Sequence, residues 1–175
     1  MKFPRATHLI CCFQYKDEAY KFYRELQIRL GKFNLNIATE KTKIIAFGRF
    51  AEERCAKIGR NKPETFDFLG FTHYCSKSEQ GKFRVKRKTS RKKYKAKLLR
   101  MKQWIRNSRK IPILIIVKEL RAKLRGHFNY YGITDNEKMI SNFYYDTIRL
   151  LFKWLNRRSQ RASIPFQYII YIRMR

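Results

Sequence analysis

The side chains with the clearest chemical potential lie in a run of lysines and arginines between residues 82 and 110. This segment carries fifteen basic side chains and no acidic one. Tyr94, Leu98 and Trp104 interrupt the run at helical spacing, which predicts a folded helix with a cationic outer face rather than a disordered tail. Phosphate groups would relieve the repulsion among so many like charges. The run is therefore a candidate binding site for a polyanion; a solvated charged face without a ligand is the alternative.

Other basic and aromatic residues extend this set of candidate nucleic-acid contacts. The strongest cluster spans Lys86 to Lys97, whereas the later basic residues could equally be solvated helix faces. Tyr130 and Tyr131 could stack on unpaired bases, but their spacing also continues an apolar stripe, so core packing is the alternative for one of them. The predicted nucleic-acid-binding residues are Lys86, Arg87, Lys88, Arg91, Lys92, Lys93, Lys95, Lys97, Arg121, Lys123, Arg125, Tyr130, Tyr131, Arg157 and Arg158.

The composition limits the class of protein. The chain has 175 residues and a net charge of +29, yet 44% of its residues are hydrophobic. That fraction can build a core, so a purely disordered chain is excluded. The longest aliphatic run, residues 111–117, is far shorter than the roughly 20 residues that a membrane span needs. No secretory signal is visible. We therefore expect a cytoplasmic protein whose partner is a polyanion and not a membrane.

Two groups of histidine and cysteine could be considered metal ligands. His8 lies near Cys11 and Cys12, and His73 lies near Cys75. Neither group has a complete ligand set at usable spacing, and the four cysteines of the chain form no C-x-x-C pair. We therefore interpret these residues as ordinary core or surface residues and expect neither a metal nor a cofactor.

The N-terminal half has the pattern of a mixed helix and strand region. Apolar residues between 19 and 33 follow one helical face, with Asp17 and Glu18 in the first turn and Gly31 at the end. Short apolar runs predict strands over residues 9–15, 35–37 and 43–47. The runs 66–74 and 82–85 flank Gly81 and predict a hairpin.

From Thr89 onward the pattern is helical and predicts three helices. Thr89 or Ser90 would cap a first helix that runs to about residue 107. Pro112 would lie in the first turn of a second helix, which Gly126 would end or bend. Asp135 would cap the third. The predicted fold class is α+β, with a strand and helix half followed by a basic three-helix half and a boundary near residue 85.

Four motifs occur in one order along the chain. They are Glu40-Lys41-Thr42-Lys43-Ile44-Ile45-x-Phe47-Gly48-Arg49-Phe50, Phe68-Leu69-Gly70-Phe71, Arg125-Gly126-His127-Phe128-x-Tyr130-Tyr131-Gly132 and Leu151-Phe152-Lys153-Trp154-Leu155-Asn156-Arg157-Arg158. Their order and spacing resemble the C-terminal part of bacterial group II intron reverse transcriptase/maturases. The resemblance runs from about Ile10 to Arg161.

This resemblance implies a layout and a partner. Residues 1–85 would be a truncated C-terminal part of the reverse-transcriptase palm, in which Phe68, Leu69, Gly70 and Phe71 look like the primer-grip turn. Residues 86–175 would be the thumb, or maturase-specific domain X. In the family this domain binds the intron's own RNA and helps it to fold, while the RNA does the chemistry. The implied partner is group II intron RNA, with DNA or an RNA/DNA hybrid as further nucleic-acid partners.

The chain also departs from the family at the catalytic site. Alignment places Arg5-Ala6-Thr7-His8 where the family has Tyr-Ala-Asp-Asp, and neither Thr nor His replaces a carboxylate pair on Mg²⁺. The fingers and earlier palm are missing from the sequence, and Lys41, which matches the lysine near the pyrophosphate, does nothing alone. We expect no catalytic residues, no polymerase activity and no endonuclease module. Mg²⁺ is expected only for the bound RNA or for a full-length relative.

Three functional hypotheses remain. The first is an RNA-binding maturase-type fragment of the bacterial cytoplasm that assists the folding and splicing of a group II intron. The second is the C-terminal subunit of a split reverse transcriptase, whose separate fingers-palm polypeptide would supply the aspartates. The third is a non-functional remnant of an intron-encoded reverse transcriptase.

Overall fold

The structure, a computed structural model, describes residues 9–158. The chain divides into two compact units, Met1–Glu64 and Thr65–Arg175. This division differs from the boundary expected near residue 85, which would cut a strand of the second unit. Each unit is described by itself.

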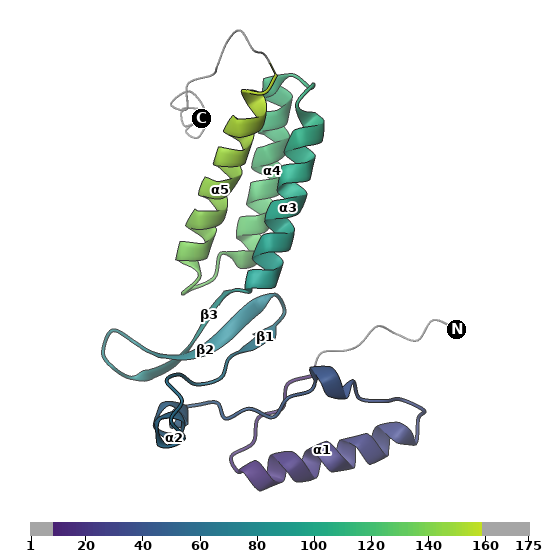
Figure 1. The fold of residues 1–175 in the computed structure, drawn as a ribbon, viewed down its shortest axis with the longest axis vertical. Helices are drawn as coiled ribbons and strands as arrows, with labels where there is room; N and C mark the ends of the chain where they lie inside the picture. The colour runs from purple at the N-terminus through teal and green to yellow at the C-terminus, as the bar shows by residue number, and fades with distance from the viewer. Residues whose placement is uncertain (1–8, 159–175) are drawn as a thin grey trace. The chain divides into compact units, whose positions relative to one another are not determined.

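The first unit contains the predicted helix but none of the predicted strands. Helix α1 covers Lys16–Gly31 with Asp17 and Glu18 in its first turn; it is followed by the short 3-10 helix η1, Thr39–Lys41, and by helix α2, Ala51–Lys57. Residues 9–15, 35–37 and 43–47 are not strands; they lie in irregular segments around α1 and η1 (Figure 1). The prediction was wrong because an apolar run becomes a strand only where another strand pairs with it, and no residue of the described part of this unit forms a ladder.

The second unit begins with a three-stranded antiparallel sheet in the order β1-β2-β3. The strands are β1, Phe66–Phe68, β2, Phe71–Lys77, and β3, Phe83–Thr89. The predicted hairpin around Gly81 is confirmed. The predicted strand over residues 66–74 is instead two strands, because the chain turns at Leu69 and Gly70, both of which have positive φ, 47° and 86°.

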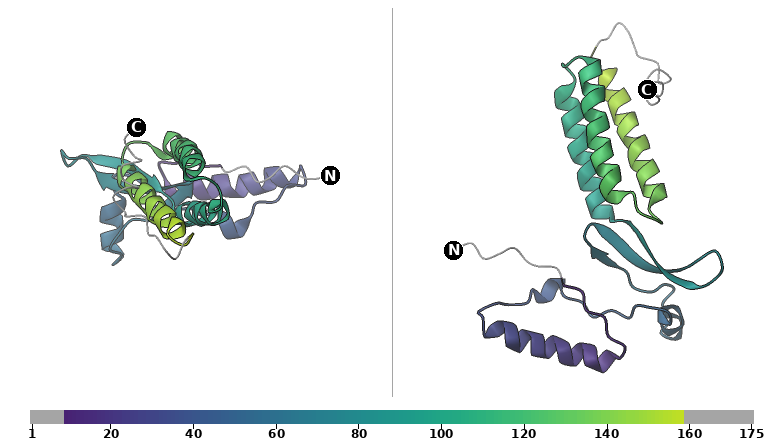
Figure 2. Two further views of the ribbon diagram at one scale, coloured as in Figure 1. Left: turned by 90° about the horizontal axis from the view of Figure 1, so that it is seen from above. Right: turned by 180° about the vertical axis from the view of Figure 1, so that it is seen from behind.

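Three helices follow the sheet and lie side by side in the views of Figures 1 and 2. They are α3, Arg91–Ser108, α4, Ile113–Tyr131, and α5, Glu137–Leu155. The Ser90 side chain caps α3 by accepting a hydrogen bond from the Lys93 amide at 3.4 Å, as predicted. Pro112 immediately precedes α4, where its missing N–H costs nothing. The α+β fold class is confirmed.

Two predicted helix boundaries were wrong. Gly126 does not end α4, because the helix continues to Tyr131 and buries Leu124 and His127 on either side of the glycine. Packing of those neighbours outweighs the intrinsic cost of a helical glycine, which is about 1 kcal/mol. Asp135 does not cap α5: the position belongs to Asn136, whose side chain bonds elsewhere.

The core of the second unit is built from the predicted apolar faces of the three helices. The largest fully buried hydrophobic side chains are those of Phe143, Ile105, Ile116 and Leu151. The cluster is completed by Met101, Leu120, Leu124, Ile148, Trp154 and Leu155. Because all three helices contribute, none of them can bury its apolar stripe without the other two.

Candidate nucleic-acid interface

Strand β3 presents basic side chains on both faces of the sheet. Lys86 and Lys88 share one face with Arg84, while Arg87 lies on the opposite face, paired with His73 of β2. The Lys88 ammonium lies 5.1 Å from the centre of the Tyr74 ring, and Arg84 forms a 3.2 Å ion pair with Asp135. On this face Lys86 and Lys88 are therefore the cations that no described acidic side chain neutralises.

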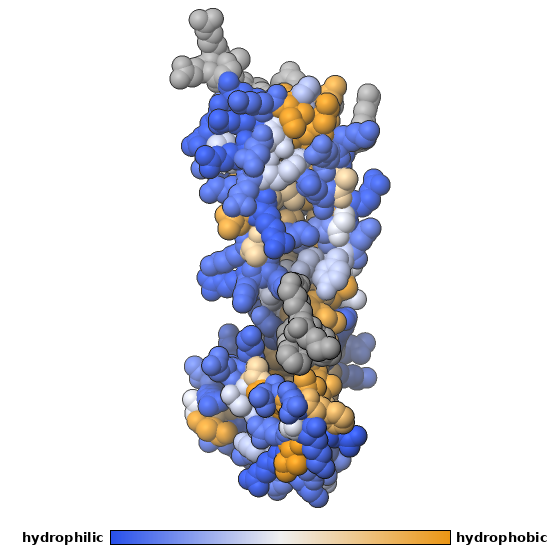
Figure 3. Space-filling view, turned by 90° about the vertical axis from the view of Figure 1, so that its right-hand side faces the viewer, coloured by the Kyte–Doolittle hydropathy of each residue, from blue (hydrophilic) through white to orange (hydrophobic). Residues whose placement is uncertain are grey.

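Helix α3 carries basic residues on both flanks of its buried stripe. Arg91, Lys92, Lys93, Lys95 and Lys97 are all exposed. Helical spacing places Arg91 and Lys95 on one flank and Lys93 and Lys97 on the other, since residues four apart lie on the same face. The predicted cluster is thus wrapped around α3 rather than gathered on one side. Over the helical bundle, the face in Figure 3 is mostly hydrophilic.

The structure separates the three basic residues predicted on α4. Arg121 and Arg125 are exposed and share a face with Lys118, at spacings of three and four residues. Lys123 lies on another flank, where its ammonium is 4.9 Å from the centre of the Trp104 ring on α3. Lys123 therefore already packs against an aromatic ring within the bundle.

The last two predicted cations lie at the far end of α5. The Arg157 guanidinium is 5.0 Å from the centre of the Trp154 ring. Arg158 donates a hydrogen bond to the backbone carbonyl of Ile111. Trp154 is itself 8% exposed, so it packs within the bundle. Arg158 thus ties this end of α5 to the α3–α4 connection, whereas Arg157 is exposed beside a ring of its own segment.

The primer-grip-like turn is docked on the C-terminal end of α4. The hydroxyl of Tyr130 donates to the carbonyl of Leu69 at 2.8 Å, and the Phe71 ring stacks on the Tyr130 ring with centroids 5.9 Å apart. Tyr131 is 8% exposed and packs against Phe71 at 5.2 Å. Tyr131 is therefore a core residue and not available to stack on a base, whereas Tyr130 keeps half of its surface exposed.

A buried asparagine that the sequence did not single out joins the sheet to the helices. The Asn136 side chain is fully buried; its Oδ1 accepts from the Thr89 amide at 2.7 Å, and its Nδ2 donates to the Tyr131 carbonyl at 2.7 Å and to the Thr89 hydroxyl at 2.9 Å. The Ser90 amide also donates to the carbonyl of Gly70 at 2.9 Å. These bonds hold β3, the turn and the α4–α5 connection together. The only sequence signal for this asparagine is that residues 132–136 have the composition of a turn, which does not indicate that Asn136 is buried.

Gly70 gives a direct test of how the turn is docked. A Cβ on Gly70 would lie 3.0 Å from the Tyr131 hydroxyl, in a backbone with φ of +86°, whereas Gly81 has φ of +75° and open space around it. Gly81→Ala is expected to cost about 1 kcal/mol through backbone strain alone. Gly70→Ala should cost about 2 kcal/mol in urea unfolding, and adding Tyr131→Phe should remove the excess. Equal costs at the two glycines would contradict the docking.

The ionisable groups inside the bundle are held neutral or hydrogen-bonded. Burial, with the nearby charge of Lys97, lowers the pKa of His127 to about 4. Its ring is 1% exposed and stacks on Phe143 with centroids 3.8 Å apart. Burial also raises the pKa of Tyr94, whose hydroxyl donates to Asp146 Oδ2 at 2.7 Å. These groups have structural environments, and neither is placed to react with a ligand.

No candidate metal centre emerges from the described residues. Arg5 to His8, the segment aligned with the family's aspartate pair, lies outside them. His8 therefore lies outside them too, whereas its neighbours Cys11 and Cys12 are described and exposed. Within residues 9–158, no three His, Cys, Asp or Glu side chains come together at metal-binding distance. In the same part of the chain, no helix is both long and apolar enough to cross a bilayer.

Comparison with known families locates one domain in the chain. Residues 91–168 match the family described as group II intron, maturase-specific domain. The matched segment starts at the first residue of α3 and takes in α4 and α5. Comparison with curated proteins and with solved structures gave no match. The match confirms the resemblance for the C-terminal, maturase-specific part of the chain; the motifs at residues 40–50 and 68–71 lie outside the matched segment.

Proposed function

Because residues 91–168 carry a group II intron maturase-specific domain, we propose that this protein binds structured group II intron RNA through the basic surface of its second unit. It would assist the folding and splicing of that RNA without polymerising DNA itself. The observation that carries the proposal is the coincidence of this domain with an acid-free basic segment. Between Glu79 and Glu119 the chain has no acidic residue.

The arrangement of the cations supports RNA as the partner. Basic side chains occupy β3, two flanks of α3 and the outer face of α4, so a folded polyanion could contact several elements at once. Such binding depends on the number of phosphates neutralised, and its affinity falls steeply with salt. The absence of polymerase activity is proposed from the sequence, since Thr7 and His8 stand where the family has its Mg²⁺-binding aspartates.

Binding to an intact group II intron RNA and to a shuffled RNA of equal length, across a salt series, tests the proposal. The intron RNA is expected to bind more tightly, and its preference should persist at high salt. A splicing assay with the same RNA would then measure the assistance. Equal and salt-labile binding to both RNAs would contradict the proposal and favour a remnant without intron specificity.

Charge variants locate the contact surface in the same assay. Replacing Lys92, Lys93 and Lys95 by glutamine should reduce the slope of log affinity against log salt by about 2, since each lost phosphate contact removes roughly 0.7–0.9. The matched control replaces Lys16, Lys21 and Arg29 on α1 by glutamine, removing three charges from the first unit. If both variants lower the slope equally, the contact surface is not on α3.

A further inference from the structure

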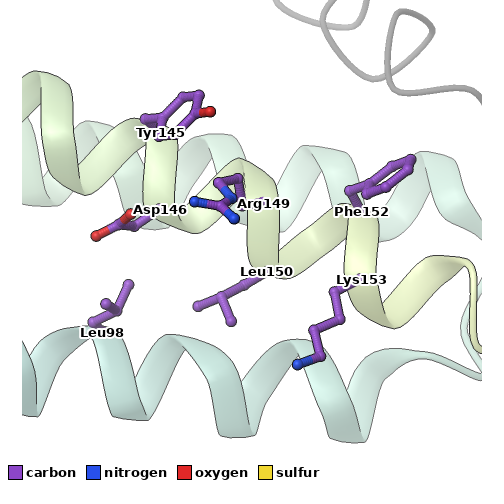
Figure 4. Close-up of a pocket in the computed structure, with 7 residues that line it drawn as sticks. All are labelled: Leu98, Tyr145, Asp146, Arg149, Leu150, Phe152 and Lys153. Atoms are coloured by element: carbon purple, nitrogen blue, oxygen red, sulfur yellow. The ribbon is translucent and has the colours of Figure 1, made fainter.

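A cavity of about 660 Å³ opens between α3 and α5, on a side of the bundle that neither the motifs nor the family match assigns a role. Figure 4 shows its lining: Leu98 of α3 and Leu150 of α5 point toward each other across the gap, and Lys153 reaches from α5 toward α3. The other residues that line it are Tyr145, Asp146, Arg149 and Phe152. The cavity is therefore a groove with an apolar floor and polar walls.

The floor of the groove is held by the bundle core. Leu98 and Leu150 are partly buried and pack against the core cluster, so their positions follow from the folding of the three helices. Tyr145 is 55% exposed, and the Arg149 guanidinium lies 5.7 Å from the centre of its ring. Figure 4 shows the Tyr145 ring pointing away from the gap between the two helices. The groove thus offers fixed apolar surface at Leu98 and Leu150 beside the planar Arg149 guanidinium, a group on which unpaired bases can stack.

The walls of the groove are cationic on both helices. On α5, Arg149 and Lys153 are four residues apart and both line the cavity. On α3, Lys95 and Lys102 are exposed and lie three residues before and four residues after Leu98, so helical spacing places them along the same edge. Cations therefore flank the apolar floor from both sides, at positions that could contact the phosphates on either side of a bound base.

One acidic side chain lines the groove and is held in place. The hydroxyl of Tyr94 donates to Asp146 Oδ2 at 2.7 Å, which fixes the carboxylate at the edge of the cavity. A carboxylate among cations would weaken the binding of a simple anion. It can, however, accept hydrogen bonds from the N–H groups on the Watson–Crick edge of an unpaired base.

We propose that the groove between α3 and α5 binds an unpaired RNA nucleotide. The base lies against Leu98 and Leu150, its N–H groups donate to Asp146, and the flanking phosphates contact Arg149, Lys153, Lys95 and Lys102. Free phosphate would contact only the cations of the groove. An acidic peptide would likewise leave the Asp146 carboxylate without a donor. This proposal rests on the RNA binding proposed above and adds that single-stranded segments, rather than duplex, enter this groove.

Two double variants of the full chain test the groove at equal loss of charge. Arg149→Gln with Lys153→Gln removes two groove cations, and Lys118→Gln with Arg125→Gln removes two from the outer face of α4. Each is titrated with a single-stranded RNA of about 12 nucleotides and with a blunt duplex of the same sequence. The groove variant is expected to lose roughly tenfold more affinity for the single strand than the α4 variant does, and the two should lose equally for the duplex.

The outcomes separate this proposal from the one on which it rests. Equal losses in both variants, with RNA binding intact in the wild type, would overturn the groove while leaving the RNA-binding function. No binding of any RNA by the wild-type chain would overturn both. Ultraviolet crosslinking of a single strand that carries 4-thiouridine gives an independent readout: crosslinks within residues 145–153 support the groove, and crosslinks confined to other faces contradict it. An acidic peptide can be used as a competitor. If it displaces the single strand from wild type but not from the α4 variant, the peptide and the strand compete at the outer face of α4, which would also contradict the groove.

Discussion

Replacing Asn136 by leucine is expected to lower the free energy of unfolding by about 3 kcal/mol, because it leaves buried polar groups of Thr89 without a hydrogen-bond partner. Leucine branches at the same carbon as asparagine but is larger, so no cavity forms and crowding of its methyl groups adds to the loss. The Thr89 amide and hydroxyl would lose their partner, and each buried group left unpaired costs about 1–3 kcal/mol. The Tyr131 carbonyl keeps its hydrogen bond from the Ile133 amide. Urea unfolding followed by circular dichroism measures the change.

Asn142 provides the matched control for this experiment. It lies on α5 and is exposed, so Asn142→Leu should change the free energy of unfolding by less than about 0.5 kcal/mol. If Asn136→Leu is equally mild, the Thr89 amide and hydroxyl must be satisfied by water, and the sheet is not joined to the helices through this side chain.

The consequence of Asn136→Leu should extend to the turn at Leu69 and Gly70. That turn is held from one side by the Ser90 amide and from the other by the Tyr130 hydroxyl, and both donors belong to elements that Asn136 joins. Hydrogen exchange of the β2 and β3 amides is therefore expected to accelerate in the variant more than exchange in the middle of α4.

The helices could be predicted from the sequence because their signals are local. The apolar spacing from Tyr94 to Ile105 requires one face, Ser90 supplies the cap, and Pro112 fits only at the start of a helix. These features act within a few residues of the chain. They therefore specify α1, α3, α4 and α5 without any information about the neighbours against which each helix packs.

The absence of strands from the described part of the first unit, and the exact helix ends, could not be predicted in this way. Whether the run from Leu9 becomes a strand depends on a partner elsewhere in the chain, and the length of α4 beyond Gly126 depends on what Tyr131 packs against. Which of Asp135 and Asn136 immediately precedes α5 also depends on distant partners. Asp135 is drawn to Arg84 of the hairpin, while Asn136 is fixed by Thr89, and both partners are distant in sequence.

The candidate site shows the same division between local and distant information. The charge of residues 82–110 is a property of composition and follows from the sequence. Which of the candidate cations pack against another element depends on residues distant in sequence or on neighbouring helices, as the position of Lys123 over Trp104 shows. The groove was missed because its two walls come from helices about fifty residues apart; the only local signal was the Arg149 and Lys153 spacing on α5.

Lowering the pH from 7.5 to about 4.5 is expected to destabilise the protein through His127. Its pKa in the folded state is about 4, below the ordinary value of about 6.5 that it regains on unfolding. Between these values the unfolded chain binds a proton that the folded chain excludes. Stability is therefore full above pH 6.5 and falls as the pH drops toward 4. At about 1.4 kcal/mol for each unit of pKa, the loss approaches about 3 kcal/mol.

The variant His127→Phe isolates this contribution from those of other groups. Phenylalanine keeps an aromatic ring against Phe143 and cannot be protonated. The unfolding free energy of wild type should therefore fall relative to that of the variant as the pH drops below 6.5, and the difference between them should be constant above that pH. Burial also lowers the pKa of His73, but this contribution is common to both proteins and cancels in the difference. Parallel stability curves from pH 7.5 to 4.5 would show that His127 is protonated in the fold, and hence that the core opens around it. A curve for wild type that falls more steeply below pH 6.5 would show that the bundle holds this histidine neutral against Lys97.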